Sequence, residues 1–272
     1  KIHDTSLIDF EHAQVDAWHW KDDFLQTQQL VNLKKKKKKS YLAKVNPKEP
    51  IRVLALADQQ VNRIVTTDDA NNEWVLISSD FGNRIANQWT ATTLSDIAVV
   101  STRTGAKKTV TQQLDGQSYL SPTGAYVLYF NREKGQWFSY DIVKGTSICL
   151  NENLPVNFAD EENDSPNLPS SYGIAGWSAD GKGVYLNDRY DIWYFDLNGK
   201  DKKLITNGQG RIQGLTFRYI PLQKTRNPRY QTPLIDAKSQ LFLSTFDNTT
   251  KFNGLYTAAA GKSSKPKELF LT

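Results

Sequence analysis

The chain has 272 residues, of which 39% are hydrophobic and 11% aromatic, so it can bury a substantial core in one or two domains. Its net charge of +5 depends on an uninterrupted run of lysines at positions 34–39, and acidic and basic residues nearly balance elsewhere. A nucleic-acid-binding face would spread basic residues among aromatic ones, so no nucleic acid partner is expected. No window approaches the roughly 18 apolar residues of a membrane-spanning helix, so no membrane span is expected.

Residues 1–57 predict a divergent unit that contains one helix and two strands. Apolar residues recur at helical spacing near 23–36, with Asp22-Asp23 in front to cap the helix and lysines at its end to match the helix dipole. Strands are expected at 41–45 and 52–56, and the turn between them runs from Pro47 to Pro50.

Four further units follow one pattern of strand, tight turn, strand, loop, strand, turn and strand. In the clearest copy, Asp180-Gly181 and Asn198-Gly199 suit hairpin turns because glycine accepts a positive φ at little cost. Its third strand alternates, so Trp193 and Phe195 are expected to face away from Tyr194. The predicted units span residues 60–113, 116–151, 173–206 and 213–272.

A four-stranded sheet with two apolar faces buries both of them only by stacking against copies of itself. The sequence therefore predicts an all-β fold: a β-propeller of four-stranded antiparallel blades, about five of them recognisable and the first divergent with a helix. We expect residues 1–272 to form a single propeller region that is part of a larger propeller. The strand tryptophans are expected to pack between blades.

The sequence offers no catalytic constellation. The histidines, His3, His12 and His19, all lie in the first twenty residues, outside the repeats, so no nucleophile–base–acid triad can be assembled. The single cysteine, Cys149, lies in an apolar strand pattern and can form no internal disulfide. We expect no catalytic residue, no metal site and no cofactor in the chain.

Several motifs carry a family resemblance. Ser178–Lys182 followed by Asp191–Asp196 resembles the repeat of TolB-like and prolyl oligopeptidase-type propellers, and this general pattern covers residues 60–272. The stretch 155–193 resembles more narrowly the N-terminal propeller of bacterial serine peptidases of the prolyl oligopeptidase family. The resemblance implies a propeller that sits over an α/β-hydrolase domain of the same parent chain and admits only short or unfolded peptides.

The chain departs from that family at one decisive point, because it contains no G-x-S-x-G nucleophile elbow. We therefore expect a portion of the propeller with the catalytic domain absent. Family relatives are often exported by Gram-negative bacteria, so the resemblance suggests a periplasmic or exported protein, while the residues themselves indicate no compartment.

The densest acidic cluster is Asp160-Glu161-Glu162, with Asp164 close by, in the insertion between two blades. Such a run is typical of a solvated loop. By analogy with the dipeptidyl peptidases of the same family, its paired carboxylates could instead hold the amino terminus of a peptide, since an ammonium group has three donors. The spacing lacks the glycine and terminal glutamate of an EF-hand, so it does not predict a calcium site.

Arg189 lies in the loop 188–191 between the second and third strands of its blade. Two roles remain open for it. It could pair with Asp188 or Asp191 and fix the loop, or it could face the central channel and meet the carboxylate of a peptide substrate.

The leading hypothesis is a non-catalytic propeller of a prolyl oligopeptidase-like serine peptidase that gates or orients peptide substrates. The alternative is a stand-alone TolB-like scaffold for protein–protein interaction. A carbohydrate-active propeller ranks last, because it would need two inward carboxylates about 5 to 9 Å apart, whereas the acids of this chain crowd into turns and one loop.

Overall fold

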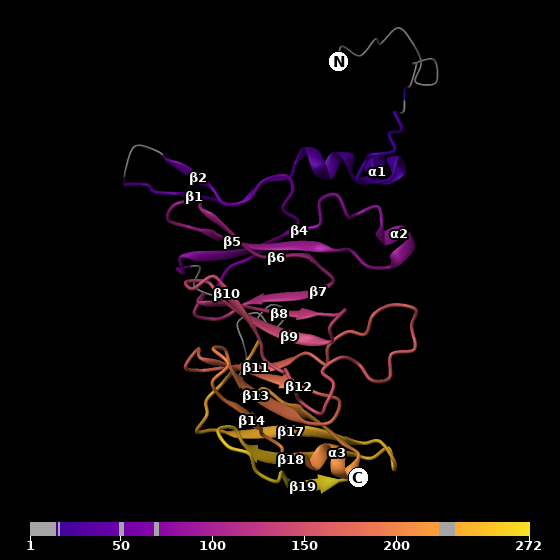
Figure 1. Ribbon diagram of the computed structural model, residues 1–272, viewed down its shortest axis with the longest axis vertical. Coiled ribbons are helices and arrows are strands. Elements are labelled where there is room, and N and C mark those ends of the chain that lie inside the picture. Colours follow the sequence, from indigo (N-terminus) through magenta and orange to yellow (C-terminus); the bar gives the residue numbers. More distant parts are fainter. Residues whose placement is uncertain (1–14, 16, 49–51, 68–70, 223–231) are drawn as a thin grey trace.

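The computed structural model describes residues 15, 17–48, 52–67, 71–222 and 232–272. Their strands form five sheets that follow one another as layers, from the α1 end of the molecule to the C-terminus (Figure 1). One sheet has two strands, three have four strands and one has five. The predicted fold class, an all-β propeller arrangement of antiparallel four-stranded sheets, is confirmed.

The sheets are numbered here in chain order. Sheet 1 consists of β1 (Ala43–Val45) and β2 (Val53–Ala55). Sheet 2 consists of β3 (Arg63–Val65), β4 (Trp74–Ser79), β5 (Ser95–Ser101) and β6 (Lys107–Leu114). Sheet 3 consists of β7 (Gly116–Leu120), β8 (Tyr126–Asn131), β9 (Gln136–Asp141) and β10 (Thr146–Cys149).

Sheet 4 contains β11 (Ile174–Ser178), β12 (Gly183–Asn187), β13 (Ile192–Asp196), β14 (Lys202–Leu204) and an added strand, β16 (Leu234–Ile235). Sheet 5 contains β15 (Leu215–Tyr219), β17 (Gln240–Asp247), β18 (Asn253–Ala259) and β19 (Lys267–Leu271). Two short helices, α2 (Asn87–Thr90) and α3 (Gln209–Gln213), lie in connections.

The hydrophobic core lies between the sheets, and alternation along each strand divides it. In β8, Val127 and Tyr129 pack in the cluster that sheet 3 shares with sheet 2. Leu128 and Phe130, one residue out of phase, pack in the cluster shared with sheet 4. The expected alternation in β13 is also confirmed, because Trp193 and Phe195 lie on the sheet 3 side whereas Tyr194 packs toward sheet 5. Each middle sheet is therefore buried on both faces.

The N-terminal helix differs from the prediction at its start. α1 spans Gln26–Lys37 and follows Leu25, with no side-chain cap and no acidic residue in its first turn. The capping expected from Asp22-Asp23 is wrong, because Asp23 forms an ion pair with Arg84 at 3.1 Å instead. The lysines in the last turn lie as predicted, where they favour the negative end of the helix dipole.

β16 is an element that the sequence pattern did not predict. It comes from the connection between β15 and β17 but pairs in parallel with β11 of the preceding sheet, Trp177 opposite Leu234. Gly176 makes this approach possible, because a Cβ atom there would lie 2.5 Å from Cδ1 of Ile235 and 2.9 Å from the Pro233 carbonyl oxygen. The inner edge of sheet 4 is thus covered by the chain itself.

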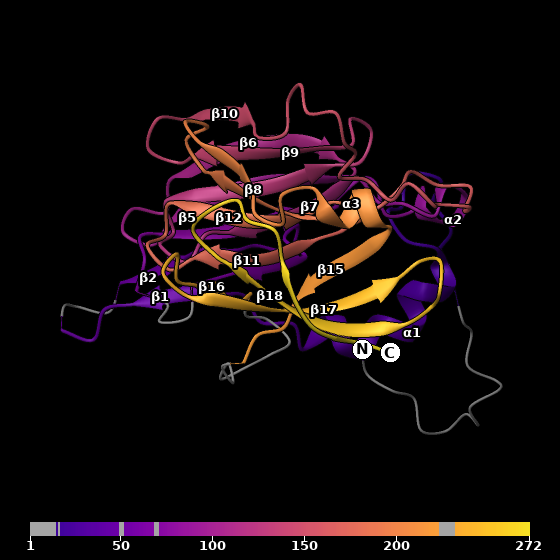
Figure 2. The same cartoon turned by 90° about the horizontal axis from the view of Figure 1, so that it is seen from below.

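The antiparallel order places two kinds of connection on one side of the layers: those between the second and third strands of a sheet, and those from one sheet to the next. We call this side the loop face. It carries α2, α3 and the long connection 150–173 between β10 and β11, on the right of Figure 1 (Figure 2 shows the same layers from below). Within the described part of the chain, no helix is long and apolar enough to cross a membrane.

Burial of both sheet faces predicts a large cost for truncating a side chain between two sheets. Leu186 is 0% exposed in the cluster between sheets 3 and 4, so Leu186→Ala should lower the free energy of unfolding by about 2–5 kcal/mol. Val143 is 80% exposed in a turn, so Val143→Ala should change it by less than about 0.5 kcal/mol. Urea unfolding followed by tryptophan fluorescence measures both, and equal effects would contradict stacking through this cluster.

Candidate functional site

The connection 150–173 is fixed at its base by an aromatic anchor. Phe158 is fully buried, with its ring centroid 5.7 Å from that of Phe195 and 6.2 Å from that of Trp193. Ala159 and Ser171 form an isolated antiparallel bridge that closes the loop above the anchor. The acidic residues that follow Ala159 are therefore held at a defined place on the loop face, next to sheet 4.

The three clustered acids differ in their surroundings. Asp160 accepts hydrogen bonds from the Tyr172 hydroxyl at 3.2 Å and from the Glu162 backbone N–H at 3.0 Å. The Glu161 backbone N–H donates to the Tyr172 hydroxyl oxygen at 2.7 Å. Burial raises the pKa of Tyr172 to about 12, and the nearby Asp160 carboxylate acts in the same direction. Tyr172 thus stays neutral, and its hydroxyl group holds the acidic segment in place through these hydrogen bonds.

Glu161 and Glu162 meet Arg189 and Arg211 in a network of ion pairs. Arg189 pairs with Glu162 at 2.5 Å and with Glu161 at 3.6 Å. Arg211, from α3, contacts both carboxylate oxygens of Glu161, at 2.8 and 3.5 Å. The hydrogen bond to Glu161 raises the pKa of Arg211. Both guanidinium groups also lie about 5 Å from the Tyr190 ring centroid, at 4.9 and 5.0 Å.

The structure thus brings together Asp160, Glu161, Glu162 and Arg189, the four candidate site residues named from the sequence. The network corrects the expected structural partners of Arg189, which pairs with the glutamates rather than with Asp188 or Asp191. The prediction that these four residues bind substrate is not decided by their proximity.

Asp188 and Asp191 instead hold the loop and helix that carry the arginines. Asp188 accepts bonds from the backbone N–H groups of Tyr190 and Asp191, both at 2.7 Å, and from the indole N–H of Trp193 at 2.8 Å. Asp191 accepts bonds from the Thr206 hydroxyl and from two backbone N–H groups of α3. Burial raises the pKa of Asp191. These buried carboxylates are structural.

A third arginine lies beneath the network. Arg218, on β15, donates hydrogen bonds to the carbonyl oxygens of Phe217 at 2.7 Å and Arg189 at 3.1 Å. Its guanidinium lies 5.7 Å from the Tyr172 ring centroid, and burial lowers its pKa. In the same region, Oδ1 of Asn187 is buried without a hydrogen-bond partner in the described part of the chain. The sequence pattern missed Arg211 and Arg218, because they come from elements far from residue 161 and belong to no local motif.

The network has an inner and an outer part. The side chain of Glu161 is 18% exposed and lies between two arginines, whereas that of Glu162 is 67% exposed and meets Arg189 alone among the ion pairs described. An ion pair as exposed as Glu162–Arg189 contributes between about 0 and 1 kcal/mol, so a charged ligand can replace either partner at little cost. The arrangement suits the binding of a zwitterion or a charged chain end.

The described residues contain no group of three or more His, Cys, Asp or Glu side chains that could hold a metal ion. His3 and His12 lie outside the described residues. His19 lies in a segment that is not a strand, and its ring stacks on Trp20 with centroids 6.3 Å apart. It is far along the chain from the ion-pair network and has no part in it.

No family model matches the chain, and no curated protein matches it. It is similar to solved structures of TolB-like and peptidase propellers. A putative TolB from Agrobacterium tumefaciens aligns with a TM-score of 0.40 and 15% identity over 85% of this chain and 74% of its own. Dipeptidyl peptidase 4 from Porphyromonas gingivalis aligns with a TM-score of 0.46 and 12% identity over 85% of this chain and 38% of its own.

The β-propeller domain of the Trilobed protease from Pyrococcus furiosus aligns with a TM-score of 0.33 and 10% identity, over 74% of this chain and 68% of its own. The alignment with the dipeptidyl peptidase covers 38% of that protein's chain, so this chain spans well under half of its length. The similarity at these identities concerns the fold, and the function has to be inferred from the side chains.

The raised pKa of Tyr172 predicts a pH effect on stability. Because the native state keeps the phenol proton up to about pH 12 whereas the unfolded chain releases it near pH 10, stability falls as the pH rises through this window. Tyr172→Phe lacks this contribution, so its free energy of unfolding should fall less with pH than that of the wild-type chain. The difference should be on the order of 1 kcal/mol once the partial solvent exposure of Tyr172 is discounted. Urea unfolding of both proteins at pH 8 and pH 11.5 measures it, since the other buried tyrosines contribute equally to both. The same loss of stability in the two proteins would contradict the assignment.

Proposed function

We propose that the chain is a non-catalytic β-propeller region of a prolyl oligopeptidase-like serine peptidase, and that its loop face orients peptide substrates. The observation that carries the proposal is the ion-pair network in which Glu161 and Glu162 meet Arg189 beside sheet 4. The family resemblance of residues 155–193 covers the acidic segment and the arginine loop together. The catalytic partner would be the α/β-hydrolase domain of the same parent chain, in an exported protein.

The exposed glutamate is the group that meets the substrate in this proposal. Glu162 extends from the network with 67% of its side chain exposed, and its carboxylate has acceptor sites beyond the one that Arg189 uses. The protonated amino terminus of a short peptide would bind there with charge-assisted hydrogen bonds. A flexible peptide can bring its amino terminus to this exposed carboxylate more readily than a folded protein can.

The remaining members of the network hold the neighbouring residue, Glu161, and so fix the backbone from which Glu162 extends. Glu161 is clamped by Arg211 in a two-oxygen contact, and the Tyr172 hydroxyl accepts the Glu161 backbone N–H. A fixed backbone at Glu162 reduces the entropy that peptide binding would otherwise lose. Orientation, rather than chemistry, is the role that these side chains can perform.

The proposal predicts weak, saturable binding of a free peptide amine. The tripeptide Ala-Pro-Ala should bind the chain in an isothermal titration at low salt, and N-acetyl-Ala-Pro-Ala should bind at least about fivefold more weakly. Glu162→Gln should cost about 2- to 5-fold in affinity, as expected for a partly exposed ion pair. Arg103→Gln is the control, because the side chain of Arg103 is 75% exposed and its salt bridge with Glu73 lies on sheet 2.

Two outcomes would contradict the proposal. Equal binding of the free and acetylated peptides would show that the amine is not recognised. Hydrolysis of Ala-Pro-p-nitroanilide that stays with the chain through purification, and that a serine-directed inhibitor blocks, would show that the chain is itself catalytic. The flanking gene sequence separates the proposal from a TolB-like scaffold, since a G-x-S-x-G motif followed by a late histidine downstream is required of a peptidase.

A further inference from the structure

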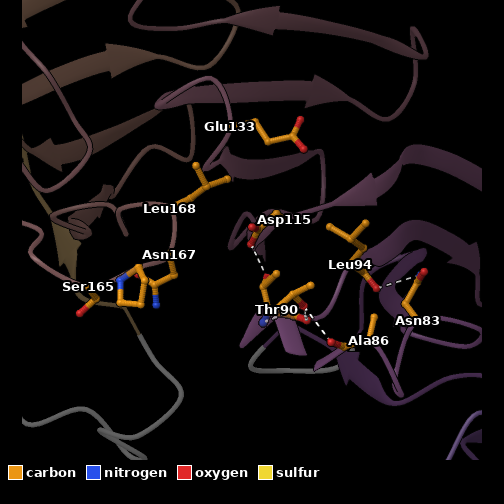
Figure 3. Close-up of a pocket in the computed structure, with 11 residues that line it drawn as sticks. Asn83, Ala86, Thr90, Leu94, Asp115, Glu133, Ser165, Asn167 and Leu168 are labelled. Carbon is orange, nitrogen blue, oxygen red and sulfur yellow. Dashed lines mark hydrogen bonds between the residues drawn. The ribbon is translucent and has the colours of Figure 1, made fainter. Parts of the chain in front are cut away.

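A second feature of the loop face is a cavity of about 590 Å³ between sheets 2 and 3 (Figure 3). One wall comes from the α2 region of sheet 2, including Leu94, and the other from the connection 150–173, including Pro166 and Leu168. Glu133 and Asp115 lie between the two walls, as Figure 3 shows. The volume lies within the range of about 300–1,000 Å³ found for small-ligand sites.

Hydrogen bonds around Asp115 hold the walls of the cavity in position without a ligand. Asp115 is 6% exposed, and its Oδ1 accepts the Thr92 hydroxyl at 2.9 Å and pairs with Arg132 at 3.2 Å. Arg132 also donates to the carbonyl oxygens of Leu168 and Pro169. One carboxylate therefore joins both walls, Thr92 on the side of sheet 2 and Arg132 on the side of the long connection. A ligand would find the walls already in place.

The charges of the cavity favour a cation. Both contacts of Asp115 fall on Oδ1, which leaves Oδ2 for an entering donor. Arg132 offsets the charge of Asp115, but Glu133 is exposed at the rim and is not a member of any ion pair among the described residues. The cavity therefore has a net negative charge, and it combines two carboxylates with walls that contain aliphatic side chains, such as Leu94 and Leu168, beside neutral polar ones.

We propose that this cavity binds the side chain of a lysine in a peptide. The aliphatic stem of lysine would lie between Leu94 and Leu168, and its ammonium group would donate to Oδ2 of Asp115 and to the Glu133 carboxylate. A lysine side chain has this combination of an apolar stem and a compact cationic tip with three donors. The inference goes beyond the proposed function, because none of these side chains belongs to the network around Glu161.

The test uses Nα-acetyl-L-lysine N-methylamide, which lacks a free α-amine and so does not address the network. Titration followed by ¹⁵N–¹H correlation spectra should give saturable shifts at Thr92 and Leu168, and binding should weaken as ionic strength rises. Nα-acetyl-L-norleucine N-methylamide has the same stem without the ammonium and should give no saturable shifts. Cadaverine tests a free diamine as the source of the ammonium.

Variants separate this site from the first one. Glu133→Gln should weaken the lysine probe about 2- to 5-fold, and it should fold normally because Glu133 is exposed. Glu152→Gln is the matched control, since Glu152 is exposed and does not line the cavity. Arg189→Gln, in the network, should leave the lysine probe unaffected. Ala-Pro-Ala, which has no lysine, should bind Glu133→Gln as it binds the wild-type chain.

Four results would overturn the proposal: no saturable shifts with the lysine probe, equal binding of the norleucine probe, equal effects of Glu133→Gln and Glu152→Gln, or binding of cadaverine without the lysine probe. Failure of peptide-amine binding at Glu162 with success here would refute the proposed function and leave this site standing. The reverse result would refute this site alone.

Discussion

The structure depends on one constraint, which is that each four-stranded sheet has two apolar faces and needs a neighbour on each. Strand alternation sends successive side chains of β8 and β12 to opposite sides, and both sides are buried because a sheet lies against each. Sheet 5 shows the consequence of having one described neighbour. Leu241 and Leu243 on its near face are fully buried, whereas Phe246 and Phe270, which alternate to the far face, are 37% and 52% exposed.

Stacking also decides where function can reside. The strands between two neighbours have no free face, so the side chains that meet a ligand come from the connections that leave the layers. The connection 150–173 matters most, because it contributes Glu161 and Glu162 to the ion-pair network at one end and Leu168 to the cavity wall at the other. Its anchor, Phe158, inserts between sheets and so links the loop to the same packing that holds the fold.

The sequence predicted the parts of the molecule that local rules determine. Alternation and glycine turns identified four of the five strands of sheet 4, and the tryptophans Trp137, Trp177 and Trp193 are buried as expected. It did not predict β16, because two residues that pair with a distant strand leave no periodic signal. It placed the start of α1 three residues too early, because Asp23 finds Arg84 across the fold rather than the helix terminus.

The candidate site also combines residues that local sequence reveals with residues that only tertiary contacts bring in. The acidic run and Arg189 are visible in the sequence as unusual local composition, and the structure brings them together. Arg211, Arg218 and Asp115 could not be selected in advance, because the contact that brings each of them to its site is with a residue at least 17 positions away. Sequence reasoning therefore located the region of the site and one of its cations, Arg189, but it missed Arg211, which also pairs with Glu161.

Native-state hydrogen exchange tests the stacking constraint most directly. If neighbouring sheets bury both faces, the amides of β8 and β12 should exchange only through global unfolding, with one free energy that matches urea unfolding, whereas β1, β2 and β19 should exchange through smaller openings. A sandwich or a single barrel would protect all the sheets alike. Equal protection of β1 and β8 would therefore contradict the account.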